Sequence, residues 1–419
     1  MTNASGAAHA IRITSQIQAV KMVFLKSLKL SGLLSFAPDS ESLPFNALNV
    51  LIGPNASGKS NVIEAIELLH AAPAAFADAI RDGGGAAEWL WKGKNSSKVA
   101  TIEAVISPSA DATSLRYRLS FTSSGQRTEV TDEVLEETEK RQPSAKDVFF
   151  FYRFQSGRPV INVREIVQGD AGTQWTERHL KRQSLVPDES VLSQRKDPDL
   201  YPELTWLGQS FARIQMFREW SFGRFAVLRQ PQPADLPTDA IMADSRNLGL
   251  ILNEIEHSDA SSEFNRLLAR FLPRFKRFST RIQGGTVQFY LHENGLTAPI
   301  PATRLSDGTI RFLAMLALLL SPAPPPLTCI EEPELGLHPD AVTMLADLLV
   351  DASKRTQLVV TTHADELVSA LTEHANSVVV CENRGGTVFE RVDPERLSLW
   401  LDKYRLGEIW RIGQLGGNP

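Results

Sequence analysis

The stretch GPNASGKSN, from Gly53 to Asn61, decides how the rest of the sequence is interpreted. It fits the pattern G-x-x-x-x-G-K-S. It lies between a short apolar run, Leu48 to Ile52, and a segment with apolar residues at helical spacing, Lys59 to His70. Glycines let backbone N–H groups turn inward around phosphates, and the N-terminus of the helix adds partial positive charge. We therefore expect a nucleotide to contact Gly53, Pro54, Asn55, Ala56, Ser57, Gly58, Lys59, Ser60 and Asn61.

Two residues at the end of this loop have expected chemical roles. Lys59 would bridge the β- and γ-phosphates and take part in catalysis, while the Ser60 hydroxyl would bind Mg²⁺. The alternative is a strand-to-helix turn with ordinary capping, but the flanking strand and helix patterns favour a phosphate-binding loop. The sequence therefore predicts ATP and Mg²⁺ as ligands.

The run LTCIEEPE, Leu327 to Glu334, is an apolar strand that ends in adjacent acids. This matches the Walker B arrangement, in which one acid supports Mg²⁺ through its water shell and the next polarises the attacking water. A general base must lie within hydrogen-bond reach of that water. We assign the metal role to Glu331 and the base role to Glu332. Taken alone, such acids more often belong to a solvated loop. Their occurrence in one chain with a phosphate loop favours the catalytic interpretation.

Two further motifs indicate a function only in combination with the phosphate loop and the acids after Ile330. Ser306, Asp307 and Gly308 directly precede an apolar helix that begins at Ile310, so by themselves they are typical of a helix N-cap. His363 ends the strand-like run VVTTH, where a lone histidine is usually structural.

Taken in order, the four motifs resemble those of the ABC ATPase superfamily. GPNASGKSN, RLSDGT, IEEPELGLHP and TTH are similar to its non-transporter branch, the RecF, SMC and OLD-type ATPases. The chain looks most like small bacterial stand-alone predicted ATPases of the AAA type, which also carry a KSLKLSGLLSF-like strand near the N-terminus and a C-terminal tail similar to Leu406 to Asn418. The resemblance covers Val23 to Trp91 and Pro301 to the C-terminus.

This resemblance implies an enzyme that converts ATP and water to ADP and phosphate within a head-to-tail homodimer. The signature residues Ser306, Asp307 and Gly308 would face a γ-phosphate held by the other copy. His363 would contact the γ-phosphate as a switch histidine, beside Lys59 and Glu332.

Several positions depart from the pattern of the superfamily. Glu331 stands where Asp is more common, and Asp307 stands where transporters usually have Gly. For the Q-loop glutamine the sequence offers only weak candidates, Gln155 and Gln194. OLD nucleases carry a C-terminal Toprim domain, but only about fifty residues follow His363. We therefore expect no nuclease domain.

The fold class that follows is α/β, an ABC-type ATPase head with a mixed sheet, an antiparallel β subdomain and an inserted α+β lid or arm. Alternating strands such as Val99 to Ile106 favour an antiparallel sheet. From the strand at Thr286 to Leu291 onward, strands alternate with helices, which indicates a mostly parallel sheet. We expect a flexible tail at 1–22, the two parts of the head at 23–140 and 286–419, and the insert at 141–285.

The segment from Ser262 to Arg281 is locally basic and contains four phenylalanines, although the net charge of the chain is −5. Basic residues mixed with aromatic ones suggest DNA contact, for which the candidates are Arg270, Arg274, Lys276 and Arg277. The alternative, which we favour for this segment, is an amphipathic helix with core phenylalanines and solvated arginines. One functional hypothesis is therefore an ATPase in DNA repair, DNA maintenance or anti-phage defence. The other is a nucleotide-dependent switch for a separate effector protein.

Two cysteines, Cys329 and Cys381, each lie in a β-branched apolar run, which is typical of reduced, buried thiols in a cytoplasmic protein. The longest strongly apolar stretch, Phe312 to Leu320, is far shorter than the ~20 residues of a membrane span. No secretory signal precedes the first convincing strand. We expect a cytoplasmic protein without a membrane partner.

Overall fold

The computed structural model describes residues 23–109, 111–125, 127–166, 173–218 and 220–417. The expected flexible tail, residues 1–22, lies outside the described residues. Three β-sheets organise the described part of the chain, with six, eight and four strands. One sheet is mixed and the other two are antiparallel, so the predicted α/β class of an ATPase head is confirmed.

The six-stranded sheet contains the nucleotide motifs. Its strands, in spatial order, are β10 (Gln215–Phe217), β15 (Leu327–Glu331), β16 (Gln357–Thr361), β3 (Leu48–Ile52), β17 (Val378–Asn383) and β18 (Thr387–Arg391). The first five strands are parallel, and β18 is an antiparallel edge strand. Parallel strands bring their carboxyl ends to one edge, so the loops after β10, β15, β16 and β3 meet there.

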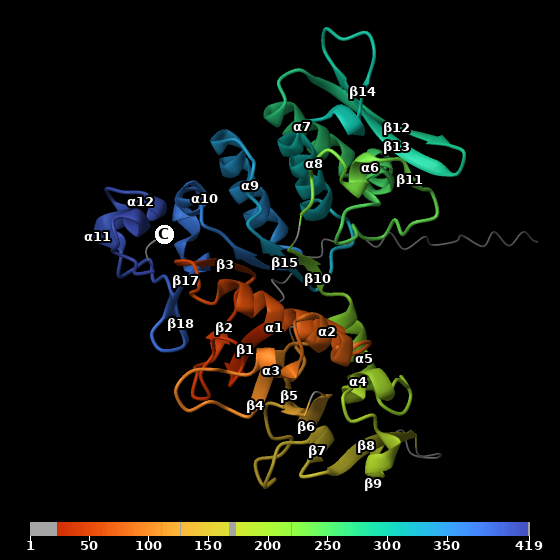
Figure 1. Cartoon of the computed structure of the whole chain (residues 1–419), viewed down its shortest axis with the longest axis vertical. Coiled ribbons are helices and arrows are strands. Elements are labelled where there is room, and N and C mark those ends of the chain that lie inside the picture. Colours follow the sequence, from red (N-terminus) through yellow and green to blue (C-terminus); the bar gives the residue numbers. More distant parts are fainter. Residues whose placement is uncertain (1–22, 110, 126, 167–172, 219, 418–419) are drawn as a thin grey trace, which may run out of the picture.

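Helices cover both faces of this sheet (Figure 1). The helix α1 (Lys59–Ala71) lies on one face, while α8 (Asp307–Leu319), α9 (Pro339–Ala352) and α10 (Asp365–Ala370) lie on the other. Successive strand residues point to opposite faces, so β16 contributes Val359 to the core around α1 and Val360 to the core around α8. Burial on both faces explains why the central strands are continuous apolar runs.

The eight-stranded sheet is antiparallel throughout and packs its inner face against the core around α1. Its strands, in spatial order, are β2 (Leu43–Pro44), β1 (Leu25–Ser31), β4 (Val99–Ile106), β5 (Leu115–Ser124), β6 (Arg127–Glu137), β7 (Phe150–Gln155), β8 (Arg158–Ile166) and β9 (Thr173–His179). We expected the first part of the head to end at residue 140. This position lies in the connection between β6 and β7, which pair with each other in the same sheet.

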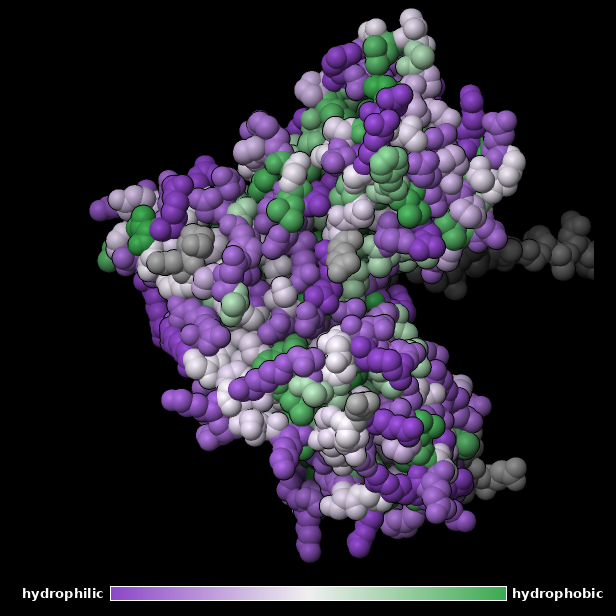
Figure 2. All heavy atoms as spheres, in the orientation of Figure 1, coloured by the Kyte–Doolittle hydropathy of each residue, from purple (hydrophilic) through white to green (hydrophobic). Residues whose placement is uncertain are grey.

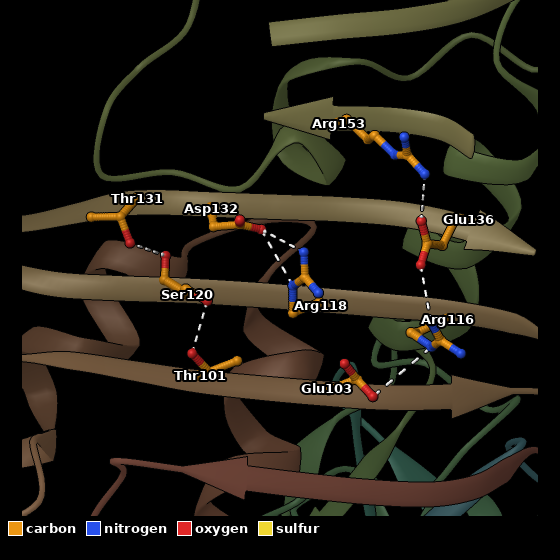
Figure 3. Close-up of polar contacts among 9 residues, drawn as sticks. All are labelled: Thr101, Glu103, Arg116, Arg118, Ser120, Thr131, Asp132, Glu136 and Arg153. Atoms are coloured by element: carbon orange, nitrogen blue, oxygen red, sulfur yellow. Dashed lines mark hydrogen bonds and ion pairs between the residues drawn. The ribbon is translucent and has the colours of Figure 1, made fainter. Parts of the chain in front are cut away.

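Polar residues form cross-strand contacts on one face of this sheet (Figure 3). Arg116 on β5 lies 3.9 Å from Glu103 on β4 and 3.1 Å from Glu136 on β6. The other carboxylate oxygen of Glu136 lies 3.0 Å from Arg153 on β7. Opposite charges on neighbouring strands favour one register of pairing. These contacts therefore align four successive strands.

The four-stranded sheet is formed by β11 (Gln232–Pro233), β12 (Phe275–Gln283), β13 (Thr286–Glu293) and β14 (Ile300–Pro301), and most of its buried hydrophobic residues belong to the core around α8. The helices α6 (Leu248–Glu256) and α7 (Ser261–Phe271) pack on it. We expected the strand at Thr286 to Leu291 to begin the parallel series, and this was wrong, because β13 pairs with antiparallel neighbours. Alternation of polar and apolar residues identifies a strand but not the sheet that it joins.

The remaining elements connect these layers. They are α2 (Phe76–Asp82), α3 (Ala86–Trp89), α4 (Val191–Gln194), α5 (Pro202–Ala212), α11 (Ser398–Leu401), α12 (Leu406–Arg411) and the short 3₁₀ helices η1 (Arg182–Ser184), η2 (Val227–Arg229), η3 (Ala302–Arg304) and η4 (Thr372–Ser377). In the part of the chain that the structure describes, no helix has the length and apolar character needed to cross a membrane. On the face drawn in Figure 2, hydrophobic residues form small separate groups among hydrophilic ones. The thiols of Cys329 and Cys381 are buried, as expected.

Candidate nucleotide site

The loop from Gly53 to Gly58 connects β3 to α1 at the carboxyl end of the parallel sheet. Gly53 has φ +143°, and a Cβ there would clash with the carbonyl oxygen of Cys381 on β17. Gly58 has φ +96°, and a Cβ there would clash with the hydroxyl of Thr387 on β18. Both positions therefore require glycine, because of the backbone conformation and because of the close approach of β17 and β18.

Lys59 is the first residue of α1, and its side chain is folded into the loop. Its Nζ donates hydrogen bonds to the carbonyl oxygens of Gly53 at 2.8 Å and Pro54 at 2.9 Å. Burial lowers the pKa of Lys59, while Cys381 and Glu332 oppose that shift. A bound phosphate would compete with the two carbonyls for the same ammonium donors.

A small hydrogen-bond network supports the loop from outside. Thr387 Oγ1 donates to the carbonyl oxygen of Ser57 at 3.0 Å and lies 2.7 Å from Ser35 Oγ. Asn61 Nδ2 donates to the same Ser35 oxygen at 2.7 Å. Ser35 and Thr387 are 352 positions apart, and sequence patterns do not identify either of them. Asn61, which we predicted to contact nucleotide, has this structural role in the described chain.

Glu331 ends β15 and lines a cavity of about 550 Å³ together with Ser60 and Glu332. The side chain of Glu331 is 17% exposed. Its Oε1 atom is buried and has no hydrogen-bond partner among the described residues. The loop residue predicted to bind Mg²⁺ and the strand residue predicted to support it therefore line the same cavity.

The residues around this cavity fit a magnesium site. A buried carboxylate oxygen without a partner is unfavourable, and a metal-bound water would satisfy it. In the described ranges, no group of three or more His, Cys, Asp and Glu side chains could hold a metal by itself. Magnesium in nucleotide sites is held by one or two protein oxygens, phosphate oxygens and waters. Ser60 and Glu331 match that requirement.

Arg218 also lines this cavity, and no motif identified it from the sequence. It follows β10, which is parallel to β15, and its guanidinium contacts Glu331 and two acids of α1, Glu64 and Glu67. Burial acts to lower the pKa of Arg218, but Glu331, Glu67 and Glu64 outweigh burial and raise it. Because β10 has only three residues, one of them polar, the sequence around Arg218 gives almost no signal for this position.

Glu332, the predicted general base, has a strained backbone. Its φ of +45° lies in the left-handed region, which costs a non-glycine residue about 1–3 kcal/mol. Its N–H donates to the carbonyl oxygen of Thr361 at 3.0 Å, so β16 helps to hold this conformation. Such strain concentrates at functional sites, where the surrounding structure maintains it.

The predicted switch histidine lies beside this residue. His363 Nε2 is 3.7 Å from Glu332 Oε1. Burial and then the charge of Lys59 lower the pKa of His363, while Glu332 opposes them. The three residues predicted as catalytic, Lys59, Glu332 and His363, therefore lie close enough to influence one another's charge.

Glu334, the third acid of the LTCIEEPE run, has a supporting position. Its Oε1 accepts hydrogen bonds from Thr362 Oγ1 at 2.6 Å and from the backbone N–H of His363 at 3.3 Å. Burial raises the pKa of Glu334, and these two hydrogen bonds partly offset the effect. Glu334 thus fixes the chain at His363 relative to the loop after β15.

The predicted signature residues lie at the N-terminus of α8. Ser306 is the N-cap, and its Oγ accepts a hydrogen bond from the N–H of Thr309 at 3.1 Å. Gly308 passes close to the chain at Gly336, since a Cβ there would lie 3.0 Å from that carbonyl oxygen. Ser306 is exposed and is not part of the lining of the Glu331 cavity. The capping interpretation is therefore observed, and the role in a second copy stays a prediction.

A buried arginine holds the signature loop in place. Arg229 is 2% exposed and forms an ion pair with Asp307. Its guanidinium also donates to the carbonyl oxygens of Ala302 at 3.2 Å and Leu305 at 2.5 Å. Asp307, which replaces the glycine of transporter signatures, thus anchors the loop to η2. The sequence contains no local signal for this contact.

The basic segment from Ser262 to Arg281 is not one amphipathic helix, because it comprises α7 and then β12. Phe264, Phe275 and Phe278 are buried in the core and cannot stack on bases. Phe271 is partly buried and stacks on the ring of Phe312. The prediction that the phenylalanines are core residues is therefore confirmed for three of the four, while Phe271 packs against the core from its edge.

The four candidate DNA contacts have different surroundings. Arg274 lies 3.3 Å from Glu293, and Arg270 lies 3.9 Å from Asp347. Lys276 and Arg277 are exposed on β12 and form no ion pair with any described residue. The positive charge of the segment is therefore partly neutralised by acids within the chain.

Neither glutamine considered for the Q-loop reaches the cavity. Gln155 ends β7 in the eight-stranded sheet. The Gln194 side chain bonds to the backbone of Val186 and Glu189. Among the described residues that line the Glu331 cavity, Arg218 directly follows β10, the strand next to β15.

Known proteins share both the sequence motifs and the fold. A family model named AAA_21, an AAA domain whose description refers to the AbiEii toxin and a type IV TA system, matches residues 48–369. The chain belongs to this family. The AAA_21 match includes the phosphate loop, Glu331, Glu332 and His363, so the chain is a P-loop ATPase of this class.

Two solved structures of Smc heads resemble the AAA_21 chain. One is the SmcHead bound to the C-winged helix domain of ScpA, with a TM-score of 0.55, 15% identity, and coverage of 89% of this chain and 99% of that one. The other is a Smc head domain with an extended coiled coil, derived from Pyrococcus furiosus and bound to the C-terminal domain of ScpA. Its TM-score is 0.52 at 14% identity, with 91% and 99% coverage. At these identities the likeness shows a shared fold.

The AAA_21 chain is also 35% identical over 74 residues to the Old nuclease of Escherichia phage P2. This match covers 17% of the chain and 12% of the length of that nuclease. The resemblance to SMC and OLD-type ATPases is therefore confirmed, while the similarity to the nuclease is distant and partial.

Proposed function

We propose that this protein binds and hydrolyses MgATP between two copies arranged head to tail. The observation that supports the proposal most strongly is the shared position of Ser60, Glu331 and Glu332 on one cavity, beside Lys59 and His363. Each of the three motifs contributes a residue type that phosphoryl transfer to water requires. If the loop after β3 were only a structural turn, there would be no reason for these acids and the histidine to lie beside it at one edge of the sheet.

Within one copy, each of these residues has a distinct proposed role. Lys59 and the backbone N–H groups of the loop would bind the phosphates. Ser60 and Glu331 would hold magnesium, which would offset the developing charge on the phosphate oxygens. Glu332 accepts the proton of the attacking water, and His363 contacts the γ-phosphate. Desolvation keeps His363 neutral to a lower pH than an exposed histidine.

The second copy would supply the remaining contact to the phosphate. Ser306 is exposed at the N-terminus of a helix of 13 residues and lies outside the cavity of its own chain. A serine hydroxyl, the backbone N–H groups and the helix dipole all favour an anion at that position. In a head-to-tail dimer each copy would present this helix end to the nucleotide of the other.

Mixing two inactive variants tests this arrangement. Lys59→Ala removes the phosphate-binding ammonium. Ser306→Asp keeps an effective N-cap but places a negative charge against the γ-phosphate. Each variant alone is expected to lose hydrolysis. An equal mixture should recover roughly a quarter of the original rate, because about half of the dimers contain one intact site. A mixture as inactive as its components would contradict the shared site.

For the cellular role we propose DNA repair, DNA maintenance or anti-phage defence. The AAA_21 description names the AbiEii toxin and a type IV TA system, and the nuclease relative comes from a phage. The alternative is a switch that controls a separate effector protein without contacting DNA. The internal ion pairs of Arg270 and Arg274, and the buried phenylalanines beside them, favour that alternative.

Reversing two exposed charges distinguishes the two roles. If the protein acts on DNA, Lys276→Glu with Arg277→Glu should weaken duplex binding at low salt by about tenfold or more, since two phosphate contacts are lost. Reversal of Arg266, which pairs with Glu263, is the matched control. Gel-shift titrations at several salt concentrations measure the effect. Absence of salt-sensitive binding in the unaltered protein would support the effector switch.

A further inference from the structure

Arg218 lies where two parallel strands end side by side. Phe217, the last residue of β10, pairs with Ile330 of β15, so the residues that follow this pair, Arg218 and Glu331, lie next to each other. Arg218 Nε lies 3.2 Å from Glu331 Oε2. The register of the sheet, rather than a flexible loop, therefore brings this guanidinium to the carboxylate at the cavity.

The same guanidinium reaches the helix that follows the phosphate loop. Arg218 Nη1 lies 2.7 Å from Glu67 Oε2, and Nη2 lies 2.9 Å from Glu64 Oε1. Glu64 and Glu67 are three positions apart on α1, so they share one face of the helix. Each of the three nitrogens of Arg218 thus contacts a different carboxylate, and together they join α1 to β15.

The contact leaves one oxygen of Glu331 available. Oε2 is held by Arg218, while the buried Oε1 has no partner among the described residues, and Glu331 lines the cavity beside Ser60. Glu331 has a longer side chain than the aspartate common in this superfamily and more rotatable bonds to fix. A second contact that restrains it would reduce the entropy lost when a metal-bound water is held.

We propose that Arg218 is a positioning residue that orients Glu331 for magnesium by bridging it to Glu64 and Glu67. The inference rests on the proposed MgATP site. Arg218 directly follows β10, the strand next to β15, and it would act through Glu331 and not on the nucleotide itself. Guanidinium geometry is essential to this role, because a lysine ammonium retains the charge but cannot hold three carboxylates with fixed orientation.

Magnesium titrations of ATP binding test the proposal with Arg218→Lys and Arg218→Gln. We expect both variants to need about tenfold more MgCl₂ than the unaltered protein for half of the magnesium-dependent gain in ATP affinity, as for other residues that orient metal ligands. ATP affinity in excess EDTA should stay within about twofold, since Lys59 and the loop are intact. Calorimetry measures both quantities, and thermal melting checks the fold.

The lysine variant separates positioning from simple charge compensation. If Arg218→Lys shows the magnesium dependence of the unaltered protein, the role is only electrostatic and the proposal is overturned. An unchanged magnesium dependence in Arg218→Gln would overturn it as well. Arg213→Gln, at an exposed position five residues upstream, is the matched control and should change nothing. If the unaltered protein itself shows no magnesium-dependent ATP binding, the proposed function fails before this inference is reached.

Discussion

Lys59→Ala is expected to weaken ATP binding by about 30-fold or more. The side chain ends in a buried ammonium that is held by the carbonyl oxygens of Gly53 and Pro54, at the centre of the phosphate loop. A charge-assisted hydrogen bond to a phosphate contributes about 2 kcal/mol, and the alanine variant has no group to replace it. Equilibrium binding of ATP, with and without magnesium, measures the loss.

The comparison needs a control for general effects of removing a lysine. Lys92 is exposed and, within the described part of the chain, forms an ion pair with Glu88 alone, so Lys92→Ala should bind ATP like the unaltered protein. Because Lys59→Ala frees two loop carbonyls, its melting temperature should be compared in the absence of nucleotide. A well-folded Lys59→Ala protein with unchanged ATP affinity would show that the loop does not bind phosphate.

Glu332→Gln is expected to lower the rate of ATP hydrolysis by about 10²-fold or more while ATP still binds. Glutamine has nearly the same shape but cannot accept the proton of the attacking water, and general-base catalysis typically contributes 10²–10⁴-fold. Glu332 has φ +45°, and we expect glutamine at this position to keep that backbone conformation, so that strain should not distinguish the two proteins. Phosphate release at saturating ATP measures the rate.

Glu373→Gln, at an exposed position on η4, serves as the matched control and should hydrolyse ATP at the unaltered rate. Magnesium dependence should be recorded for Glu332→Gln as well, because Glu331 and not Glu332 is assigned to the metal. Equal rates for Glu332→Gln and the unaltered protein would remove Glu332 as the base and direct attention to His363.

The parts of this site that sequence patterns predicted are those encoded by consecutive residues. The phosphate loop needs glycines at fixed spacing between a strand and a helix, and all of these lie between Leu48 and His70. Likewise, β15 and the acids that follow it form one run. Local chemistry, hydrogen-bonding geometry and hydrophobic periodicity are sufficient for such features.

The parts that sequence patterns did not predict depend on contacts between distant segments. Arg218 meets Glu64 from 154 positions away, and Thr387 supports Ser57 from 330 positions away. Only the order of strands in the sheet places β10 beside β15, and a three-residue strand carries almost no periodic signal. Strand order is also the reason why β13 was assigned to the wrong sheet, because periodicity does not show which strands become neighbours.

The size of the Glu332→Gln protein in solution tests most directly whether two copies close around the nucleotide. Light scattering coupled to gel filtration would be run without nucleotide, with ADP and with MgATP. We predict a mass of twice the 46.3 kDa chain with MgATP, because ATP is bound but not hydrolysed, and less of this species with ADP. A single-chain mass at saturating MgATP would contradict the shared site.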